Sequence, residues 1–239
     1  MPDLPSTCAI VTGTSSGIGQ AIALKLLNEG WHVHGLDIAP TKITNPAFTS
    51  WQLDLTQINE LANTLDQILI QQLPQVLVHA AGVLRVGSLG SLDLHAGQLM
   101  WQLHVDVATQ LANRVLPVMQ QAGQGRMVLV GSRVSSGIAG RSQYAATKAA
   151  LLSLARSWAA ECIARGVTVN VVSPAATDTP MLKDPARANT TPRLPPIGRL
   201  IHPDEVAALV AYLTRLEAAA ITGQDIAICG GSSLQRECN

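Results

Sequence analysis

The amino-acid sequence predicts an α/β fold, a single doubly wound domain in which helices cover both faces of a parallel sheet. Three observations predict it. Short apolar runs alternate with longer segments of helical spacing along the 239 residues. A glycine-rich turn follows the first of these runs directly. Aromatic residues make up only 3% of the chain, so the core must consist of Ala, Val, Leu and Ile, which fill buried parallel strands.

Six short apolar runs are expected to form the strands, because aliphatic and β-branched residues dominate each of them. They lie at residues 8–11, 33–36, 76–78, 127–130, 167–172 and 226–228. Helices are expected at residues 18–29, 56–71, 95–121, 142–165 and 203–216. Pro40 and Pro46 leave little room for a helix between Asp37 and Trp51, so that crossover is expected to be short.

The stretch from Ala175 to Leu200 contains five prolines and no sustained period, which is typical of a long loop. Long loops inside compact domains are often functional, so residues 175–200 are expected to form a substrate lid. No internal repeat, low-complexity tract or linker divides the chain. We therefore expect residues 1–239 to form a single domain.

Composition and charge exclude several classes of function. Lysine plus arginine (16) equals aspartate plus glutamate (16), so no net charge attracts nucleic acid or an anionic membrane. No apolar run approaches the roughly 20 residues that span a bilayer, and the N-terminus lacks a secretory pattern, so a cytoplasmic location is expected. The four cysteines lack the spacing of a zinc site or a disulfide framework, and no metal site is expected.

The glycine-rich turn lies between the first predicted strand and the first predicted helix, as in a Rossmann domain. Gly13 permits a tight turn, Gly17 lets a pyrophosphate approach the backbone, and Gly19 allows close packing of helix on strand. The helix N-terminus offers unpaired N–H groups to the phosphates. The residues expected to bind a dinucleotide here are Gly13, Ser15, Ser16, Gly17, Ile18 and Gly19. A plain structural turn is the alternative.

An acid, Asp37, ends the second predicted strand about 20 residues beyond the glycines. A carboxylate there accepts hydrogen bonds from the adenosine ribose and repels a 2′-phosphate, which favours NAD over NADP as the cofactor. Ser16 and Ile38 are not the basic residues that would pair with such a phosphate. A solvated loop aspartate is the alternative.

Three polar residues later in the chain form a candidate catalytic group. Tyr144 and Lys148 are four residues apart at the start of a predicted helix and project from one face. A lysine ammonium beside a phenol lowers the phenol pKa, which lets a tyrosinate act as a base near neutral pH. Ser132 ends a predicted strand, where its hydroxyl would hold a substrate oxygen. A pair that merely packs on a helix surface is the alternative for Tyr144 and Lys148.

With these pieces in this order, the sequence resembles the short-chain dehydrogenase/reductase family over essentially its whole length. The matching positions are 12–19, 54–55, 80–82, 132, 144, 148, 173–174, 179–181, 221–224 and 230–231. The resemblance implies an NAD-dependent oxidoreductase with Tyr144 as acid/base, Ser132 orienting the reacting oxygen and Lys148 on the nicotinamide ribose. The further cofactor contacts that it implies are Asp54 and Leu55 at the adenine, Gly82 with Ala80 and Ala81 near the ribose, and Thr177 or Thr179, with Pro174, near the carboxamide.

Three segments depart from the family's pattern. Ala175 follows Pro174 where the family usually has Pro-Gly, which is expected to stiffen the backbone near the nicotinamide. His79 and Ala80 stand where the family commonly has two asparagines, so a side-chain amide that braces the sheet is missing. Counting back from Ser132 places His104 at the family's fourth catalytic position, usually an asparagine that helps to hold a water for proton transfer. We hypothesise that His104 joins this proton relay. The alternatives are a helix histidine satisfied by the backbone, and Asp106 in that position if the helix bulges.

Within the family, the sequence is most similar to the 2,3-dihydro-2,3-dihydroxybenzoate dehydrogenases, in the short crossover after Asp37 and in residues 80–87, 173–179 and 225–234. This similarity implies oxidation of a cyclic dihydrodiol acid. A carboxylated substrate favours a guanidinium, which binds it through two parallel hydrogen bonds. The candidate substrate residues are Arg85, Arg133, Arg187 and Arg193, with Met181 as an apolar wall.

Two other functions stay open: a general ketone or 3-oxoacyl reductase, and a nucleotide-binding protein of the same fold without activity. The helices predicted at 95–121 and 142–165 carry more apolar positions than a monomer surface needs, among them Leu151, Leu154 and Trp158. We therefore expect copies of the chain to associate, and the family resemblance implies a homotetramer.

Overall fold

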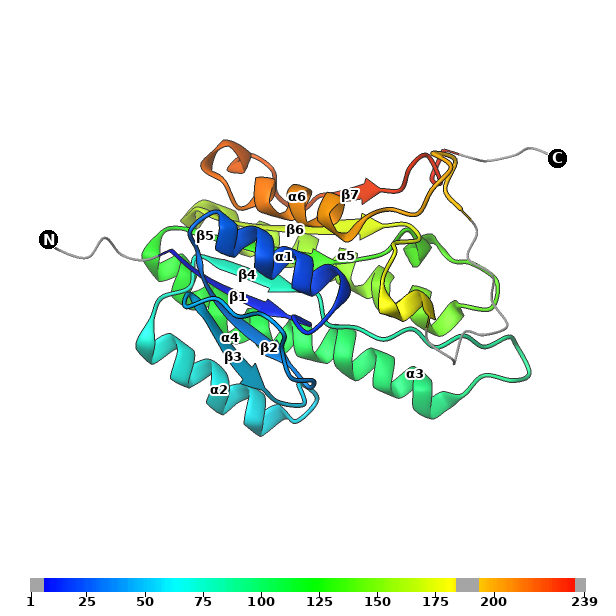
Figure 1. Cartoon of the computed structure of the whole chain (residues 1–239), viewed down its shortest axis with the longest axis horizontal. Helices are drawn as coiled ribbons and strands as arrows, with labels where there is room; N and C mark the ends of the chain where they lie inside the picture. The colour runs from blue at the N-terminus through cyan, green and yellow to red at the C-terminus, as the bar shows by residue number, and fades with distance from the viewer. Residues whose placement is uncertain (1–6, 184–193, 235–239) are drawn as a thin grey trace, which may run out of the picture.

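The computed structural model describes residues 7–183 and 194–234, and its centre is one parallel sheet (Figure 1). Its strands are β1 (Cys8–Thr12), β2 (His32–Asp37), β3 (Phe48–Gln52), β4 (Val76–His79), β5 (Gly125–Val130), β6 (Val167–Pro174) and β7 (Asp225–Ile228). They are arranged in the order β3-β2-β1-β4-β5-β6-β7. The order reverses between β1 and β4, and doubly wound sheets bind their ligands at such a switch point. The predicted fold class is confirmed.

Helices cover both faces of this sheet. They are α1 (Gly17–Asn28), α2 (Ile58–Gln71), α3 (Leu94–Trp101), α4 (Val107–Ala122), α5 (Ser142–Cys162) and α6 (Pro203–Leu213). Helices α1 and α6 pack side by side on one face, and α2, α4 and α5 lie on the other (Figure 1). Because both faces are covered, every residue of β1, β4, β5 and β6 is buried, which explains their continuous apolar runs.

Strand β3 is absent from the sequence prediction. It pairs with β2 alone at the edge of the sheet, and its residues are half-buried or exposed. Its sequence, Phe-Thr-Ser-Trp-Gln, therefore lacks the apolar run that identified the buried strands. The short crossover before it is confirmed, since no helix lies between β2 and β3 in the described chain.

The helix predicted at 95–121 is interrupted. A five-residue π-helix, η1 (Gln102–Asp106), separates α3 from α4, and it buries the adjacent side chains His104 and Val105. Hydrophobic spacing does not distinguish a π-bulge from a regular turn, so the sequence predicted one helix. The expectation that Leu151 contributes to a contact between copies is also wrong. Leu151 lies on the inner face of α5, in the chain's own core, and cannot form a surface for another copy.

The first part of the predicted lid follows β6 directly and contributes to the cavity wall. Residues Pro180–Lys183 form a short 3-10 helix, and Thr177 makes an isolated bridge to Ile201. Residues 184–193, which include the candidates Arg187 and Arg193, lie outside the described residues. In the chain that the structure describes, no helix combines the length and apolarity needed to cross a membrane.

Candidate active site

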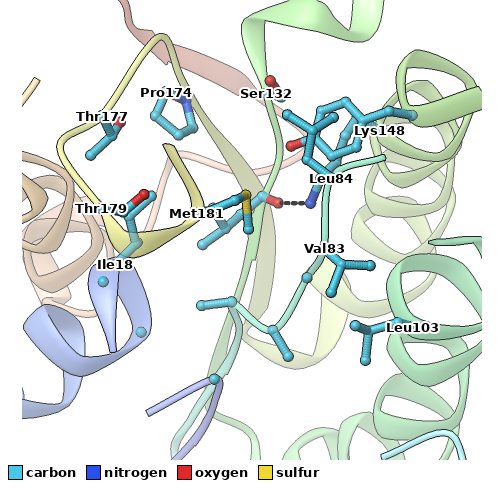
Figure 2. A pocket seen from close by; sticks show the side chains of 18 of the residues that line it. Ile18, Val83, Leu84, Leu103, Ser132, Lys148, Pro174, Thr177, Thr179 and Met181 are labelled. Carbon is cyan, nitrogen blue, oxygen red and sulfur yellow. Dashed lines mark hydrogen bonds between the residues drawn. The ribbon is translucent and has the colours of Figure 1, made fainter. Parts of the chain in front are cut away.

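A cavity of about 780 Å³ runs along the carboxyl edge of the sheet at the switch point. It is lined by the turn after β1, by the ends of β2, β4, β5 and β6, and by the start of α5. Figure 2 shows Ser132, Lys148, Thr177, Thr179 and Met181 around this space. The volume lies within the range of sites that hold a small-molecule ligand or cofactor.

The glycine turn forms one wall of this cavity. Gly13 and Gly17 have left-handed backbone angles, with φ of 78° and 57°. A side chain at Gly13 would meet the backbone of Ala81 at 2.9 Å, and one at Gly19 would collide with the carbonyl of Gly13. The Ser16 side chain does not cap α1, so the first-turn N–H groups remain available beside the cavity. This cradle suits the phosphates of a dinucleotide.

Asp37 lies at the far end of the cavity from the candidate catalytic group. Its carboxylate accepts hydrogen bonds from the backbone N–H of Ser15 and of Ala39, each at 2.9 Å. Each carboxylate oxygen has a second lone pair that remains for the hydroxyls of a ribose. Asp54 and Leu55, which follow β3, line the cavity at the same end. The sequence-predicted adenosine residues thus come together around one end of the cavity.

Ser132, Tyr144 and Lys148 come together at the other end of the cavity, and all three are buried. Ser132 lies two residues after the end of β5, and its hydroxyl oxygen accepts a hydrogen bond from the N–H of Val134. Lys148 Nζ lies 5.8 Å from the centre of the Tyr144 ring. Nζ also donates a 2.8 Å hydrogen bond to the carbonyl of Val130, drawn as the dashed line in Figure 2. Strand β5 therefore positions both Ser132 and Lys148.

Burial lowers the pKa of Lys148 to about 7. A buried ammonium is unfavourable without an opposite charge beside it, and a Tyr144 phenolate would supply that charge. The pair can therefore gain or lose one proton near neutral pH. Near neutral pH this arrangement can take a proton from an alcohol or return one to a carbonyl.

His104 is buried behind the cavity wall, and the geometry fixes its tautomer. Its Nε2 accepts a 3.1 Å hydrogen bond from the backbone N–H of Val83, so the ring proton resides on Nδ1. Nδ1 donates to the hydroxyl of Thr147 at 2.8 Å, and Thr147 donates in turn to the carbonyl of Tyr144. Burial, with the nearby Lys148, holds the pKa of His104 well below its usual range.

Protein groups therefore occupy both ring nitrogens of His104, which favours a bracing role over the predicted relay. The alternative that Asp106 takes this position required a bulge in the helix, and the helix does bulge here. Asp106 is nevertheless exposed to solvent, and His104 keeps the inward position. The ring meets that of Tyr144 edge-on at 5.6 Å. His104 thus connects the loop after β4 with the first turns of α5.

His79 replaces the bracing side chain that the sequence analysis described as missing. The Thr12 hydroxyl accepts from the N–H groups of Ala80 and Ala81, so its own proton goes to His79 Nδ1. His79 Nε2 then donates to the carbonyl of Leu103 at 3.1 Å. An imidazole, in place of an amide, joins β1 and β4 to the π-helix. Burial lowers the pKa of His79 to about 3, so the ring stays neutral.

Three groups of predicted residues remain to be placed. Ala80, Ala81, Gly82, Pro174, Thr177 and Thr179 all line the cavity between its two ends. Of the predicted substrate residues, Arg133 and Met181 line it, whereas Arg85 does not, and its guanidinium donates to the carbonyl of Leu84. Sequence reasoning missed Arg141, which also lines the cavity; its place three residues before Tyr144 was the available signal.

This sheet, the glycine cradle and the Ser132, Tyr144 and Lys148 group together define an oxidoreductase that uses a nicotinamide dinucleotide. A family model described as enoyl-(acyl carrier protein) reductase matches residues 13–233. The chain belongs to the short-chain dehydrogenase/reductase family.

Relatives of different substrate class are equally similar to the chain. The 3-oxoacyl-(acyl-carrier-protein) reductase FabG of Vibrio cholerae is 33% identical, covering 96% of this chain and 98% of that protein. The 2,3-dihydro-2,3-dihydroxybenzoate dehydrogenase of Escherichia coli is also 33% identical, covering 94% and 96%. A solved structure of actinorhodin polyketide ketoreductase with NADPH has a TM-score of 0.85 at 26% identity, covering 95% and 97%. These comparisons support the oxidoreductase class without selecting a substrate.

Proposed function

We propose that this protein transfers hydride between a secondary alcohol and NAD, with Tyr144 as the acid/base. The observation that carries the proposal is one cavity with the glycine cradle and Asp37 at one end and Ser132, Tyr144 and Lys148 at the other. A nicotinamide dinucleotide that spans these ends supplies the hydride acceptor in oxidation and the hydride donor in reduction.

The chain's own residues perform the proton chemistry in this proposal. The hydroxyl of Ser132 holds the reacting oxygen, and Tyr144 as tyrosinate takes the alcohol proton. In reduction Tyr144 returns a proton to the carbonyl oxygen. Lys148, anchored on the Val130 carbonyl, supplies the positive charge that stabilises the tyrosinate. The walls exclude water and hold the reacting carbon at one distance and on one face.

NAD is the proposed cofactor because of the charge at the adenosine end. Asp37 and Asp54 line that end, and the basic residues among the described cavity residues are Arg133, Arg141 and Lys148 at the other end. A 2′-phosphate beside Asp37 would face a like charge without a cation to offset it.

The proposed substrate is a cyclic dihydrodiol such as 2,3-dihydro-2,3-dihydroxybenzoate. The equal similarity to a dihydrodiol dehydrogenase and to FabG keeps a ketone or 3-oxoacyl reductase as the second candidate. Apolar side chains such as Leu84, Leu99 and Met181 on the cavity wall are compatible with either class.

The test is the absorbance of reduced nicotinamide while the purified protein meets 2,3-dihydro-2,3-dihydroxybenzoate, with NAD and NADP in parallel. We expect turnover with NAD and at least about tenfold lower kcat/KM with NADP. Turnover of 3-oxoacyl substrates alone would select the second candidate. Tight NADH binding without turnover of any secondary alcohol or ketone would contradict the proposal.

We further propose a cytoplasmic homo-oligomer, with four copies as the family resemblance implies. Trp101 and Leu99 on α3 are 44% and 39% exposed, and Leu154 and Trp158 on α5 are half-buried, which supports a contact between copies there. Sedimentation of the purified protein tests this, and a monomer at micromolar concentration would contradict it.

A further inference from the structure

Two arginine side chains line the cavity near the candidate catalytic group. Arg133 directly follows Ser132, and Arg141 stands immediately before α5, three residues from Tyr144. Both are half-buried and both line the cavity. Within residues 7–183 and 194–234, neither guanidinium makes a hydrogen bond or an ion pair. A half-buried cation gains from an opposite charge beside it, so these two guanidiniums are suited to hold the anionic group of a ligand in the cavity.

The cavity's own acids cannot serve as these partners. Asp37 ends β2 and Asp54 follows β3, whereas Arg133 follows β5. Strands β1 and β4 lie between β2 and β5, so about 14 Å separates the two sides at a spacing of about 4.8 Å per strand. The positive end and the negative end of the cavity are therefore distinct.

Backbone contacts hold both arginines in place. Arg141 donates its N–H to the carbonyl of Ile138 at 3.1 Å and forms a bridge with Gly87 in the loop after β4. Arg133 begins a 3-10 helix, which the hydrogen bond from the N–H of Gly137 to the carbonyl of Val134 closes at 2.8 Å. The backbone from which each arginine side chain extends is thus fixed, next to Ser132 for Arg133 and three residues before Tyr144 for Arg141.

The surface around these charges is apolar. Val134 and Ile138, which lie between the two arginines in the sequence, line the cavity together with Leu84 and Leu99. A ligand for this end therefore combines a compact apolar body with one anionic group. A carboxylate fits a guanidinium through two parallel hydrogen bonds, and an apolar ring fits the walls.

We propose that Arg133 and Arg141 form a carboxylate subsite that selects ring-bearing carboxylic acids as substrates. The selection of substrates rests on the proposed oxidoreductase function, because the subsite adjoins Ser132 and Tyr144. Anion binding itself does not require turnover. Arg141, which stands immediately before the helix that carries Tyr144, is a specificity-determining residue in this assignment.

The test is calorimetric titration of the purified protein with benzoate and with its neutral analogue benzamide, with and without NADH. We expect benzoate to bind at least about tenfold more tightly than benzamide, since a hydrogen bond to a charged group contributes that much. Arg133→Gln and Arg141→Gln should each remove the preference. Arg156→Gln, an exposed position on α5 with the same change of charge, should retain it.

Equal affinity for benzoate and benzamide, no binding of benzoate, or a preference that survives both glutamine variants would overturn the proposal. Thermal unfolding of each variant checks its fold, and Arg141→Lys, which keeps the charge without the planar fork, should retain part of the preference. A benzoate preference without turnover of any alcohol would leave the subsite intact and refute the oxidoreductase assignment. Turnover of neutral alcohols as efficiently as carboxylated ones would refute the subsite and support the oxidoreductase assignment.

Discussion

Replacing His104 tests whether this residue braces the site or relays protons. His104→Ala removes the acceptor for the Val83 N–H and the donor to the Thr147 hydroxyl. An unsatisfied N–H costs about 1–3 kcal/mol, and loss of the second hydrogen bond costs about 0.5–1.5 kcal/mol. We therefore expect the free energy of unfolding to fall by about 2–4 kcal/mol. His104→Asn, which keeps an acceptor and a donor on a shorter side chain, should recover part of that loss.

The kinetic consequence separates the two roles. If His104 is a brace, its loss lets the loop after β4 and the first turns of α5 shift. His104→Ala should then lower kcat and leave the pH midpoint of the rate unchanged. The pKa of His104 lies well below its usual range, so the ring stays neutral in the working pH range and cannot contribute a midpoint there. A relay that titrates would shift the midpoint when it is removed.

The assay is the rate of NADH formation between pH 5.5 and 9.5 for the natural protein, His104→Ala and His104→Asn, with urea unfolding in parallel. A midpoint that moves by about one pH unit or more in His104→Ala would refute the brace. Unchanged stability and unchanged rate would refute both roles. Thr147→Val, which removes the next hydroxyl in the chain of hydrogen bonds, is the matched variant. It should lower kcat by less than His104→Ala does.

Three further outcomes are expected. Tyr144→Phe should reduce turnover by at least about a thousandfold while NADH binding, measured by fluorescence, stays within about threefold; substantial remaining turnover would contradict the acid/base role. Asp37→Asn keeps an acceptor for the Ser15 N–H but removes the charge, so the ratio of kcat/KM for NADP to that for NAD should rise about tenfold, and an unchanged ratio would contradict the charge argument. Burial lowers the pKa of His34 to about 4 and that of His79 to about 3, from 6.5 in the unfolded chain. Their contribution to stability is fully present above pH 6.5. Below pH 6.5 the free energy of unfolding should fall by about 1.4 kcal/mol per pH unit for each ring, because the unfolded chain binds more protons. Equal urea midpoints at pH 7 and pH 5 would contradict this expected loss of stability.

Features carried within one element were predictable from the sequence. The buried strands appear as continuous apolar runs because helices cover both faces of the sheet. The glycine turn, Asp37 and the four-residue spacing of Tyr144 and Lys148 each depend on a single turn, strand end or helix, whose period the sequence displays directly. Strand β3 escaped prediction because an edge strand needs no apolar run.

Features that depend on contacts between elements were not predictable. His104 bonds with Val83 and Thr147, which are 21 and 43 residues away, and a π-bulge sets its direction. Arg85 seemed as good a substrate residue as Arg133, yet its guanidinium turns to the Leu84 carbonyl.

The sequence by itself determined the buried strands, most of the helices, the cofactor cradle and the identity of the candidate catalytic group. Only the tertiary structure decided how His79 and His104 join the strands and helices around that group and that Arg141 joins Arg133 on the cavity wall. The physical reason is that local spacing follows from backbone geometry, whereas the direction of a side chain between elements follows from how those elements pack.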